Sequence, residues 1–296
     1  MVAFDERHLE HAGFQLAVCP ALGGAITRFA FDGFDLLRRW DGSDQVRQTS
    51  CFVLAPYSNR VAGSHFAFAG TPYALRRNSP DHALPIHGVG WKRAWQVDEQ
   101  GPNQLTLSLE HDPGQGDASL DWPFAFRLIH SLRLSDRGLD MTLELINTDA
   151  RAMPAGLGWH PFFPRHGQIE LAFAAKAVWL ADAEQLPAEQ VAIPPQWDFQ
   201  QMRPVETPGL DNNFTGWDGR ARIAWPDRLL ELTIETGPGL EYLIVYTPPG
   251  KDFIAVEPVS HANAALNRGG DGLESLEPGQ TLTRHCRLQL SRLQAD

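Results

Sequence analysis

Cysteine is scarce in this sequence and shows no paired spacing. Only three of the 296 residues are cysteine, and none of them forms a CxxC pair: Cys19, Cys51 and Cys286. Such an odd, scattered set indicates neither a disulfide framework nor a zinc clip, so we expect buried reduced thiols. The histidine pair His82 and His87 and the pair His160 and His166 also match no zinc pattern, and we expect no metal site.

Positive charge is also in short supply. The chain has 25 lysine and arginine residues against 36 aspartate and glutamate residues, which gives a formal net charge of -11 at pH 7. Nucleic-acid affinity depends on clustered cations that release counterions from the phosphate backbone. The charge balance therefore argues against a nucleic-acid partner and favours a neutral substrate.

Long apolar runs are missing too. No segment of the sequence is a continuous apolar stretch long enough to cross a bilayer. Residues 1–10 contain four charged side chains and lack the apolar stretch of a secretory signal. We therefore expect a protein that is not exported, has no membrane partner and works in the cytoplasm.

Convincing long helical patterns are absent, and the dominant period is two. Apolar and polar residues alternate over 105–110, 126–135, 139–145 and 230–235. Such alternation is typical of half-buried strands, whose successive side chains point to opposite faces of a sheet. The 26 glycines and 22 prolines are spread along the chain, with no break in composition. We predict an all-β fold, a single large antiparallel domain over residues 1–296.

Two histidines interrupt this pattern beside glycine, proline and tryptophan. His87 lies in the segment 86–91 between glycines and Trp91, and His160 lies in 156–163 among aromatic residues. Histidine has a reference pKa of about 6.5, so it can donate or accept a proton near neutral pH. From the residues alone, a surface histidine in a turn and a satisfied structural histidine remain open for these positions.

Three further candidates are polar residues at the ends of apolar runs. Glu257 follows the apolar run 253–256; buried at a cleft floor it would have a raised pKa suited to a general base, and otherwise it marks where a strand reaches solvent. Arg60, next to Asn59, offers a guanidinium fork, and Asp211 offers acceptors for hydroxyl groups. Asp211 and Glu257 also leave a glycosidase open, because such enzymes need two carboxyl groups about 5 to 10 Å apart.

The order of these segments along the chain is more specific than any one of them. In sequence order the elements are Asn59-Arg60-Val61, His87-Gly88, Gly158-Trp159-His160-Pro161-Phe162-Phe163, Asp211-Asn212-Asn213-Phe214, and Val256-Glu257-Pro258 followed by Ser260-His261 and Asn267. Together they resemble the aldose 1-epimerase family, also called galactose mutarotases, over nearly the whole chain. The resemblance implies a galactose mutarotase-like β-supersandwich of antiparallel sheets.

The resemblance also implies an activity. It is that of an isomerase that interconverts the α and β anomers of a free hexose, with a small-molecule monosaccharide as its partner and no metal or other cofactor. Glu257 would act as the base and His160 as the acid in opening the sugar ring. The residues implied to bind the substrate are Asn59, Arg60, His87 and Asp211.

Two other functions stay open at this stage. A hexose-6-phosphate 1-epimerase would share the acid–base pair but would need cations for the phosphate, and Arg76, Arg77 and Arg93 are available. A non-catalytic sugar-binding or sensing protein on the same scaffold would need neither His160 nor Glu257 for proton transfer. The sequence does not decide between a monomer and a homodimer.

Overall fold

The computed structural model of the protein describes residues 4–205 and 209–293. Within these ranges the regular elements are β-strands and 3₁₀ helices of three residues each, and there is no α-helix. Paired strands run antiparallel in both large sheets. The predicted all-β fold of antiparallel sheets is confirmed. The prediction of one domain over 1–296 includes residues outside the described ranges and stays a prediction.

Most strands belong to two large sheets. Among the described residues the larger sheet has eleven strands: β1 (Arg7–His11), β2 (Phe14–Cys19), β3 (Ala25–Phe31), β4 (Phe34–Asp35), β5 (Cys51–Leu54), β13 (Gly158–Pro164), β15 (Ala177–Ala181), β16 (Pro187–Val191), β18 (Asp211–Thr215), β21 (Tyr242–Tyr246) and β22 (Phe253–Val259). Its spatial order is β1-β2-β3-β5-β13-β22-β21-β18-β15-β16, with β4 paired to β3. Strands distant in sequence, such as β5 and β13, therefore lie next to one another.

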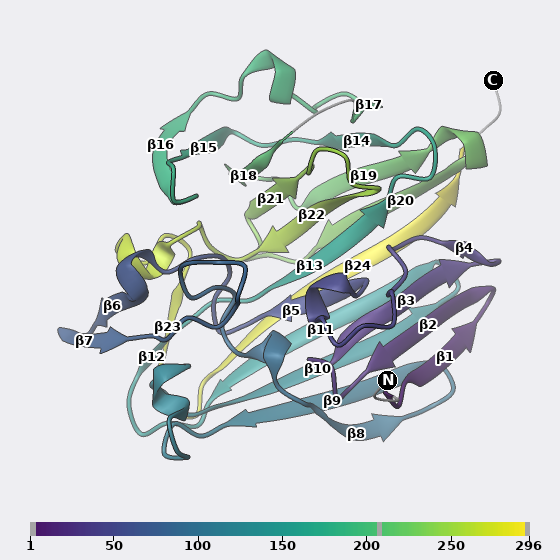
Figure 1. Ribbon diagram of the computed structural model, residues 1–296. Coiled ribbons are helices and arrows are strands. Elements are labelled where there is room, and N and C mark those ends of the chain that lie inside the picture. The colour runs from purple at the N-terminus through teal and green to yellow at the C-terminus, as the bar shows by residue number, and fades with distance from the viewer. Residues whose placement is uncertain (1–3, 206–208, 294–296) are drawn as a thin grey trace.

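The second sheet has nine strands within the described ranges: β8 (Gln96–Gln100), β9 (Gln104–His111), β10 (Phe126–Ser135), β11 (Gly138–Asn147), β14 (Glu170–Phe173), β17 (Arg203–Pro204), β19 (Arg220–Trp225), β20 (Leu230–Thr236) and β24 (Thr281–Arg292). Its order is β17-β14-β19-β20-β24-β11-β10-β9-β8. In Figure 1 the long strands β24, β11, β10 and β9 of this sheet run side by side diagonally across the molecule.

Short elements connect the sheets. Two small two-stranded sheets are formed by β6 (His65–Phe68) with β7 (Thr71–Ala74) and by β12 (Met153–Ala155) with β23 (Glu274–Leu276). The 3₁₀ helices are η1 (Val46–Gln48), η2 (Ala62–Ser64), η3 (Gly90–Lys92), η4 (Ala118–Leu120), η5 (Pro195–Trp197), η6 (Pro226–Arg228) and η7 (Ala265–Asn267).

The four segments with a period of two are strands of the second sheet. The runs 105–110, 126–135, 139–145 and 230–235 lie in β9, β10, β11 and β20. Burial alternates along β10 and β11 because one face of this sheet packs against the first sheet and the other faces solvent. The alternation in the sequence therefore reflects a sheet with one buried face.

One hydrogen bond between side chains crosses the core from sheet to sheet. Trp159 of β13 is fully buried, and its indole Nε1–H donates to Nε2 of His130 on β10 at 3.1 Å. Burial lowers the pKa of His130 to about 3, so the ring stays neutral and its Nε2 can accept this bond. Trp159 precedes His160, and adjacent strand residues face opposite ways, so the bond fixes β13 from the side opposite to His160.

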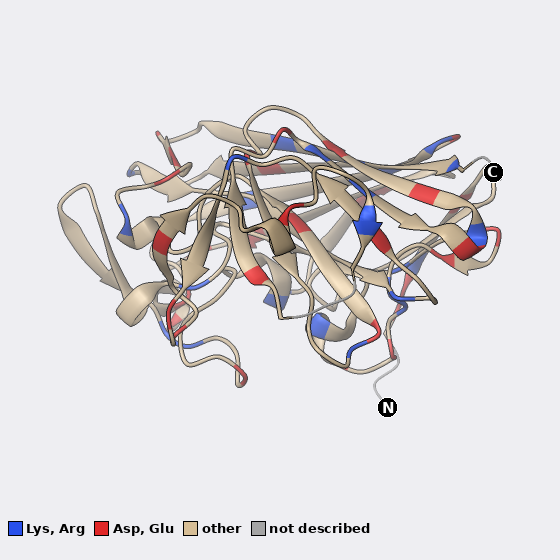
Figure 2. Cartoon of the chain, turned by 90° about the horizontal axis from the view of Figure 1, so that it is seen from above, with Lys and Arg blue, Asp and Glu red and all other residues tan. Residues whose placement is uncertain are grey.

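The surface carries both positive and negative side chains. Figure 2 shows acidic and basic residues interspersed over the ribbon, and exposed ion pairs such as Arg287–Asp140 at 2.6 Å join neighbouring strands.

The expectation of buried thiols is confirmed, because Cys19, Cys51 and Cys286 are buried and unpaired among the described residues. In the same part of the chain, no helix is long and apolar enough to cross a membrane.

The bond between the two sheets yields a stability prediction. Trp159→Phe removes the donor and leaves a buried imidazole nitrogen unpaired, so the free energy of unfolding should fall by roughly 1–3 kcal/mol, measured by urea denaturation. Adding His130→Leu removes the second polar group, and the double variant should regain much of that loss. Equal urea midpoints for Trp159→Phe and the parent protein would contradict the role of this bond.

Candidate active site

Strand register places a histidine opposite a glutamate on the outer face of the larger sheet. The pairs Gly158↔Val259 and Phe162↔Ala255 between β13 and β22 bracket His160 and set it across from Glu257. Nε2 of His160 lies 3.1 Å from Oε1 of Glu257. The face of the sheet opposite to the main core therefore carries an imidazole and a carboxyl group in direct contact.

Glycine allows the two strands to come this close. A Cβ atom on Gly158 would lie 2.7 Å from the carbonyl oxygen of Pro258, which is shorter than real Cβ contacts. A larger residue at position 158 would push β13 away from β22, two residues before His160. The Gly158-Trp159-His160 sequence thus combines close strand approach, an anchor in the core and a titratable group on the opposite face.

A cavity of about 160 Å³ surrounds the His160–Glu257 pair. All six candidate residues predicted from the sequence line it: Asn59, Arg60, His87, His160, Asp211 and Glu257. Four further lining residues were not predicted: Arg47, His82, Ile86 and Tyr246. The sequence segments are far apart in the chain, and the fold brings them together in one small polar pocket.

His87 is held in one protonation and tautomeric state. The backbone N–H of Asn59 donates to Nδ1 of His87 at 3.0 Å, so Nδ1 is the acceptor and the ring proton resides on Nε2. Burial, aided by the neighbouring His160, lowers the pKa of His87 well below its usual value. The ring is therefore a neutral hydrogen-bond donor. The alternative of a surface histidine in a turn is wrong for this position, because His87 is buried.

Asn59 and Asp211 position the guanidinium of Arg60. The side-chain oxygen of Asn59 accepts bonds from the backbone N–H of Arg60 at 2.9 Å and from its Nη1 at 3.2 Å. On the other side, Nη2 of Arg60 lies 4.0 Å from Oδ2 of Asp211. Burial raises the pKa of Asp211, and the charge of Arg60 opposes that rise. One side of the pocket thus presents the guanidinium donors of Arg60 beside the carboxylate acceptors of Asp211.

Burial controls the protonation states of His160 and Glu257, the pair at the centre of the pocket. Burial, reinforced by the carboxylate of Asp211, raises the pKa of Glu257 well above its usual value, while Arg60 opposes the rise. Burial, reinforced by Arg38 and Arg47, lowers the pKa of His160 well below 6.5. Both shifts favour uncharged groups.

An uncharged pair and an ion pair of these two groups hold the same number of protons. Glu257 protonated with His160 neutral differs from Glu257 ionised with His160 protonated only by transfer of one proton across the 3.1 Å contact. The pair can therefore give a proton at one atom and take one at another without exchange with solvent. For Glu257, the alternative of a carboxylate at the solvent end of a strand is wrong, because the residue is 2% exposed.

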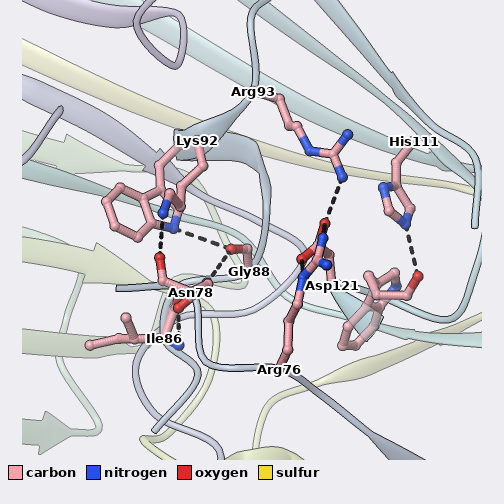
Figure 3. Close-up of polar contacts among 10 residues, drawn as sticks. Arg76, Asn78, Ile86, Gly88, Lys92, Arg93, His111 and Asp121 are labelled. Atoms are coloured by element: carbon pink, nitrogen blue, oxygen red, sulfur yellow. Dashed lines mark hydrogen bonds and ion pairs between the residues drawn. The ribbon is translucent and has the colours of Figure 1, made fainter. Parts of the chain in front are cut away.

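The loop that carries His87 is fastened from behind by a residue that sequence reasoning missed. Nδ2 of Asn78 donates to the carbonyl oxygens of Ile86 at 2.7 Å and Gly88 at 3.0 Å, and its Oδ1 accepts from the N–H of Ile86 at 3.0 Å (Figure 3). These bonds hold both neighbours of His87, whose φ of 61° lies in the left-handed region. Asparagine in a polar loop is too common a residue to have marked this role.

The arginines considered for a phosphate lie elsewhere. Arg76, Arg77 and Arg93 line a different hollow, of about 880 Å³, which Gly88 also lines. Two of them are already engaged, since Asp121 accepts from Nε of Arg76 at 2.6 Å and from Nη2 of Arg93 at 2.7 Å (Figure 3). None of the three lines the pocket around His160 and Glu257. Among the described residues, no group of three or more His, Cys, Asp or Glu side chains is placed to hold a metal ion.

These features define an antiparallel β-sandwich protein with an imidazole–carboxyl pair in a small polar pocket. The sequence model of the aldose 1-epimerase family matches residues 6–289. The uncharacterized protein YphB of Escherichia coli K12 is 33% identical over 295 residues, which span 96% of this chain and 98% of YphB. The chain belongs to the aldose 1-epimerase family.

Solved structures agree with this assignment. A crystal structure of an Escherichia coli K12 protein described as a candidate aldose 1-epimerase has a TM-score of 0.91 at 32% identity, covering 98% of this chain and 100% of that chain. A galactose 1-epimerase from Lactobacillus acidophilus NCFM shares the fold with a TM-score of 0.80 at 16% identity, covering 98% of this chain and 95% of that chain. The galactose mutarotase-like fold predicted from the sequence is confirmed.

The hydrogen bonds of Asn78 yield a second stability prediction. Asn78→Ala removes all three bonds to the His87 loop, and the free energy of unfolding should fall by roughly 1–3 kcal/mol. Asn103→Ala is the matched control, because Nδ2 of Asn103 makes one bond, to the carbonyl of Leu134 at 2.9 Å. Urea denaturation of both variants measures the difference. A loss no larger for Asn78→Ala than for Asn103→Ala would show that these bonds do not hold the loop.

Proposed function

We propose that this protein is an aldose 1-epimerase that interconverts the α and β anomers of a free hexose. The observation that carries the proposal is the direct 3.1 Å contact between Nε2 of His160 and Oε1 of Glu257 inside a pocket lined by hydroxyl-binding groups. Anomer exchange needs one group that takes a proton and another that gives one at a neighbouring oxygen. This pair supplies both groups side by side.

The proposed reaction opens the sugar ring and closes it again. Glu257, ionised in the reactive form of the pair, takes the proton of the C1 hydroxyl, and His160 protonates the ring oxygen as the C1–O5 bond breaks. The products of this step are an open-chain aldehyde, protonated Glu257 and neutral His160. Rotation about the C1–C2 bond exposes the other face of the carbonyl. His160 then recovers the C5 hydroxyl proton, Glu257 returns its proton to O1, and the ring closes as the other anomer.

The remaining candidate residues have positioning roles in this proposal. His87, with its proton on Nε2, donates to a sugar oxygen without changing protonation state. Arg60 donates to one sugar hydroxyl and Asp211 accepts from another, so both fix the ring relative to the acid–base pair. Asn59 acts behind them, because its backbone N–H fixes His87 and its side chain holds Arg60.

Charge around the pocket supports a sugar without a phosphate. Arg47 lines the pocket, and its Nη1 forms an ion pair with Oδ2 of Asp81 at 3.0 Å. Arg60 faces Asp211. Each guanidinium that lines the pocket therefore has a carboxylate beside it, whereas a phosphate dianion needs cations that are not already neutralised.

Loss of solvent around both His160 and Glu257 supports catalysis over sugar binding alone. A binding protein gains affinity from Arg60, Asp211 and His87 without placing an imidazole and a carboxyl group in direct contact. Desolvating two titratable groups is unfavourable, and such shifted pKa values concentrate where proton transfer is needed. We further propose that the chain works as a single domain, as a monomer or homodimer, in the cytoplasm.

The experiment is polarimetry of freshly dissolved α-D-glucose and α-D-galactose with catalytic amounts of protein in a weakly catalytic buffer. We expect a faster approach to the same final rotation. Glu257→Gln and His160→Asn should each slow the catalysed rate by about 10² to 10⁴-fold, because each removes one proton-transfer group. Glu184→Gln makes the same chemical change at an exposed loop position and should keep the parent rate.

Other outcomes separate the rival functions. Exchange of glucose 6-phosphate without exchange of glucose would replace the proposal with a hexose-6-phosphate 1-epimerase. Binding of glucose or galactose in a calorimeter, with no acceleration of either, would indicate a sugar-binding protein. Full activity in a correctly folded Glu257→Gln or His160→Asn variant would refute the assigned roles.

A further inference from the structure

We propose that Arg38, which does not line the pocket, is a positioning residue whose partly buried positive charge sets the pH range in which the His160–Glu257 pair works. The inference rests on the proposed function for its kinetic test, and it adds a residue that neither the motifs nor the pocket lining point to. Arg38 contacts both strands that carry the pair, shares the ring of Phe162 with His160, and is one of the cations that act on His160.

Arg38 joins three segments next to the site. Its guanidinium carbon lies 3.8 Å from the ring centre of Phe162 on β13 and 4.4 Å from that of Phe253 on β22. Its Nη2 donates to the carbonyl oxygens of Arg47 at 2.6 Å and Thr49 at 2.8 Å. Arg47 is part of η1 and lines the pocket, so Arg38 holds this pocket segment against the two strands that carry the acid–base pair.

The ring of Phe162 connects Arg38 to His160. The imidazole of His160 packs against two phenyl rings, with ring centres 4.6 Å away for Phe52 and 4.4 Å away for Phe162, and these two phenyl rings also contact each other with centres 6.1 Å apart. Arg38 lies over Phe162. Phe162 therefore contacts both the imidazole of His160 and the guanidinium of Arg38. These contacts hold the imidazole in place and set an apolar ring against both groups, so the charge of Arg38 acts on His160 through a medium less polar than water.

Arg38 stays charged although it is partly buried. Loss of water lowers its pKa to about 10, with Asp252 and Asp41 opposing and Arg47 adding to the shift, so the group is still a cation at neutral pH. Its hydrogen bonds go to carbonyl oxygens, whose partial charges do not cancel a full positive charge. The guanidinium is therefore a fixed, partly buried cation, on which the carboxylates of Asp252 and Asp41 also act.

The charged and titratable groups around the pair come from several elements. His160 faces Glu257 of β22 at 3.1 Å, the ring of His87 with centres 5.7 Å apart, and the cations Arg38 and Arg47. Of the cations that lower the pKa of His160, Arg38 has the larger effect. On the far side, Glu257 faces Asp211 and Arg60, which act in opposite directions.

A fixed positive charge has a defined effect on a pair that shares one proton. The reactive pair loses its proton at high pH and gains a second one at low pH, and both steps belong to the pair as a whole. A nearby cation disfavours every added proton, so it lowers both apparent pKa values. Arg38 thus moves the whole active range toward lower pH. A residue with only a structural role would change the height of the profile without moving both limbs in one direction.

The test is the pH dependence of anomer exchange in Arg38→Met and Arg38→Lys, with glucose or galactose as substrate. In Arg38→Met both limbs of the profile should move to higher pH by roughly one unit, because a cation that shares the ring of Phe162 with His160 is lost. Arg38→Lys keeps the charge but loses the planar guanidinium over Phe162, so its limbs should stay in place while the maximal rate falls. Arg93→Met, with the same loss of charge in the other hollow, should move neither limb.

Several results would overturn the inference. The inference fails if the limbs of the pH profile do not move in Arg38→Met, or if they move in opposite directions. It also fails if the limbs move as far in Arg38→Lys as in Arg38→Met. If Arg38→Met does not fold, as judged by circular dichroism, Arg38→Gln makes the same charge change with a polar side chain. NMR titration of the His160 imidazole is a second readout that needs no substrate. If the parent protein exchanges no sugar, the proposed function fails, and this titration still decides whether Arg38 controls the pair.

Discussion

The functional account depends on the pairing of β13 with β22. Their register sets His160 against Glu257, and Gly158 permits the close approach of the two backbones. The tryptophan next to His160 binds the opposite sheet through His130, so β13 is fixed on both of its faces. Sheet geometry alone therefore places an imidazole and a carboxyl group in contact at the bottom of a small pocket.

Loss of water then gives this contact its chemistry. In solution a glutamate and a neutral imidazole would titrate independently near their ordinary pKa values. Here burial disfavours the charge on each group, and the 3.1 Å contact makes the two groups titrate as a coupled pair. The surrounding groups differ in kind, because His87 is a fixed neutral donor and Arg60 is a fixed cation. His160 and Glu257 can exchange protons, whereas the groups around them keep their protonation states. This arrangement suits a reaction that takes up and releases equal numbers of protons.

Much of the fold and of the site could be predicted from the sequence. The rest depends on which strands pair, and the alternation of apolar and polar residues does not show that. Period-two alternation identified strands of the sheet that has one solvent face, such as 126–135. It says less about strands buried on both faces, and nothing about which strands pair. Arg47 and Tyr246 were therefore missed as pocket residues, since only the order β5-β13-β22-β21-β18 brings their segments to the site. Arg38 was missed because its influence passes through Phe162 and not through the pocket.

The measurement that tests this account most directly is a ¹³C NMR titration of the Glu257 side-chain carboxyl, assigned by its disappearance in Glu257→Gln, recorded together with the ¹⁵N signals of His160. The account predicts that the pair retains one shared proton through neutral pH. Neither group should then titrate near its reference pKa of about 4.3 for Glu or about 6.5 for His. A carboxyl group that ionises near its reference value, beside an imidazole that remains neutral, would contradict the account, because no proton would then be left for the sugar ring oxygen.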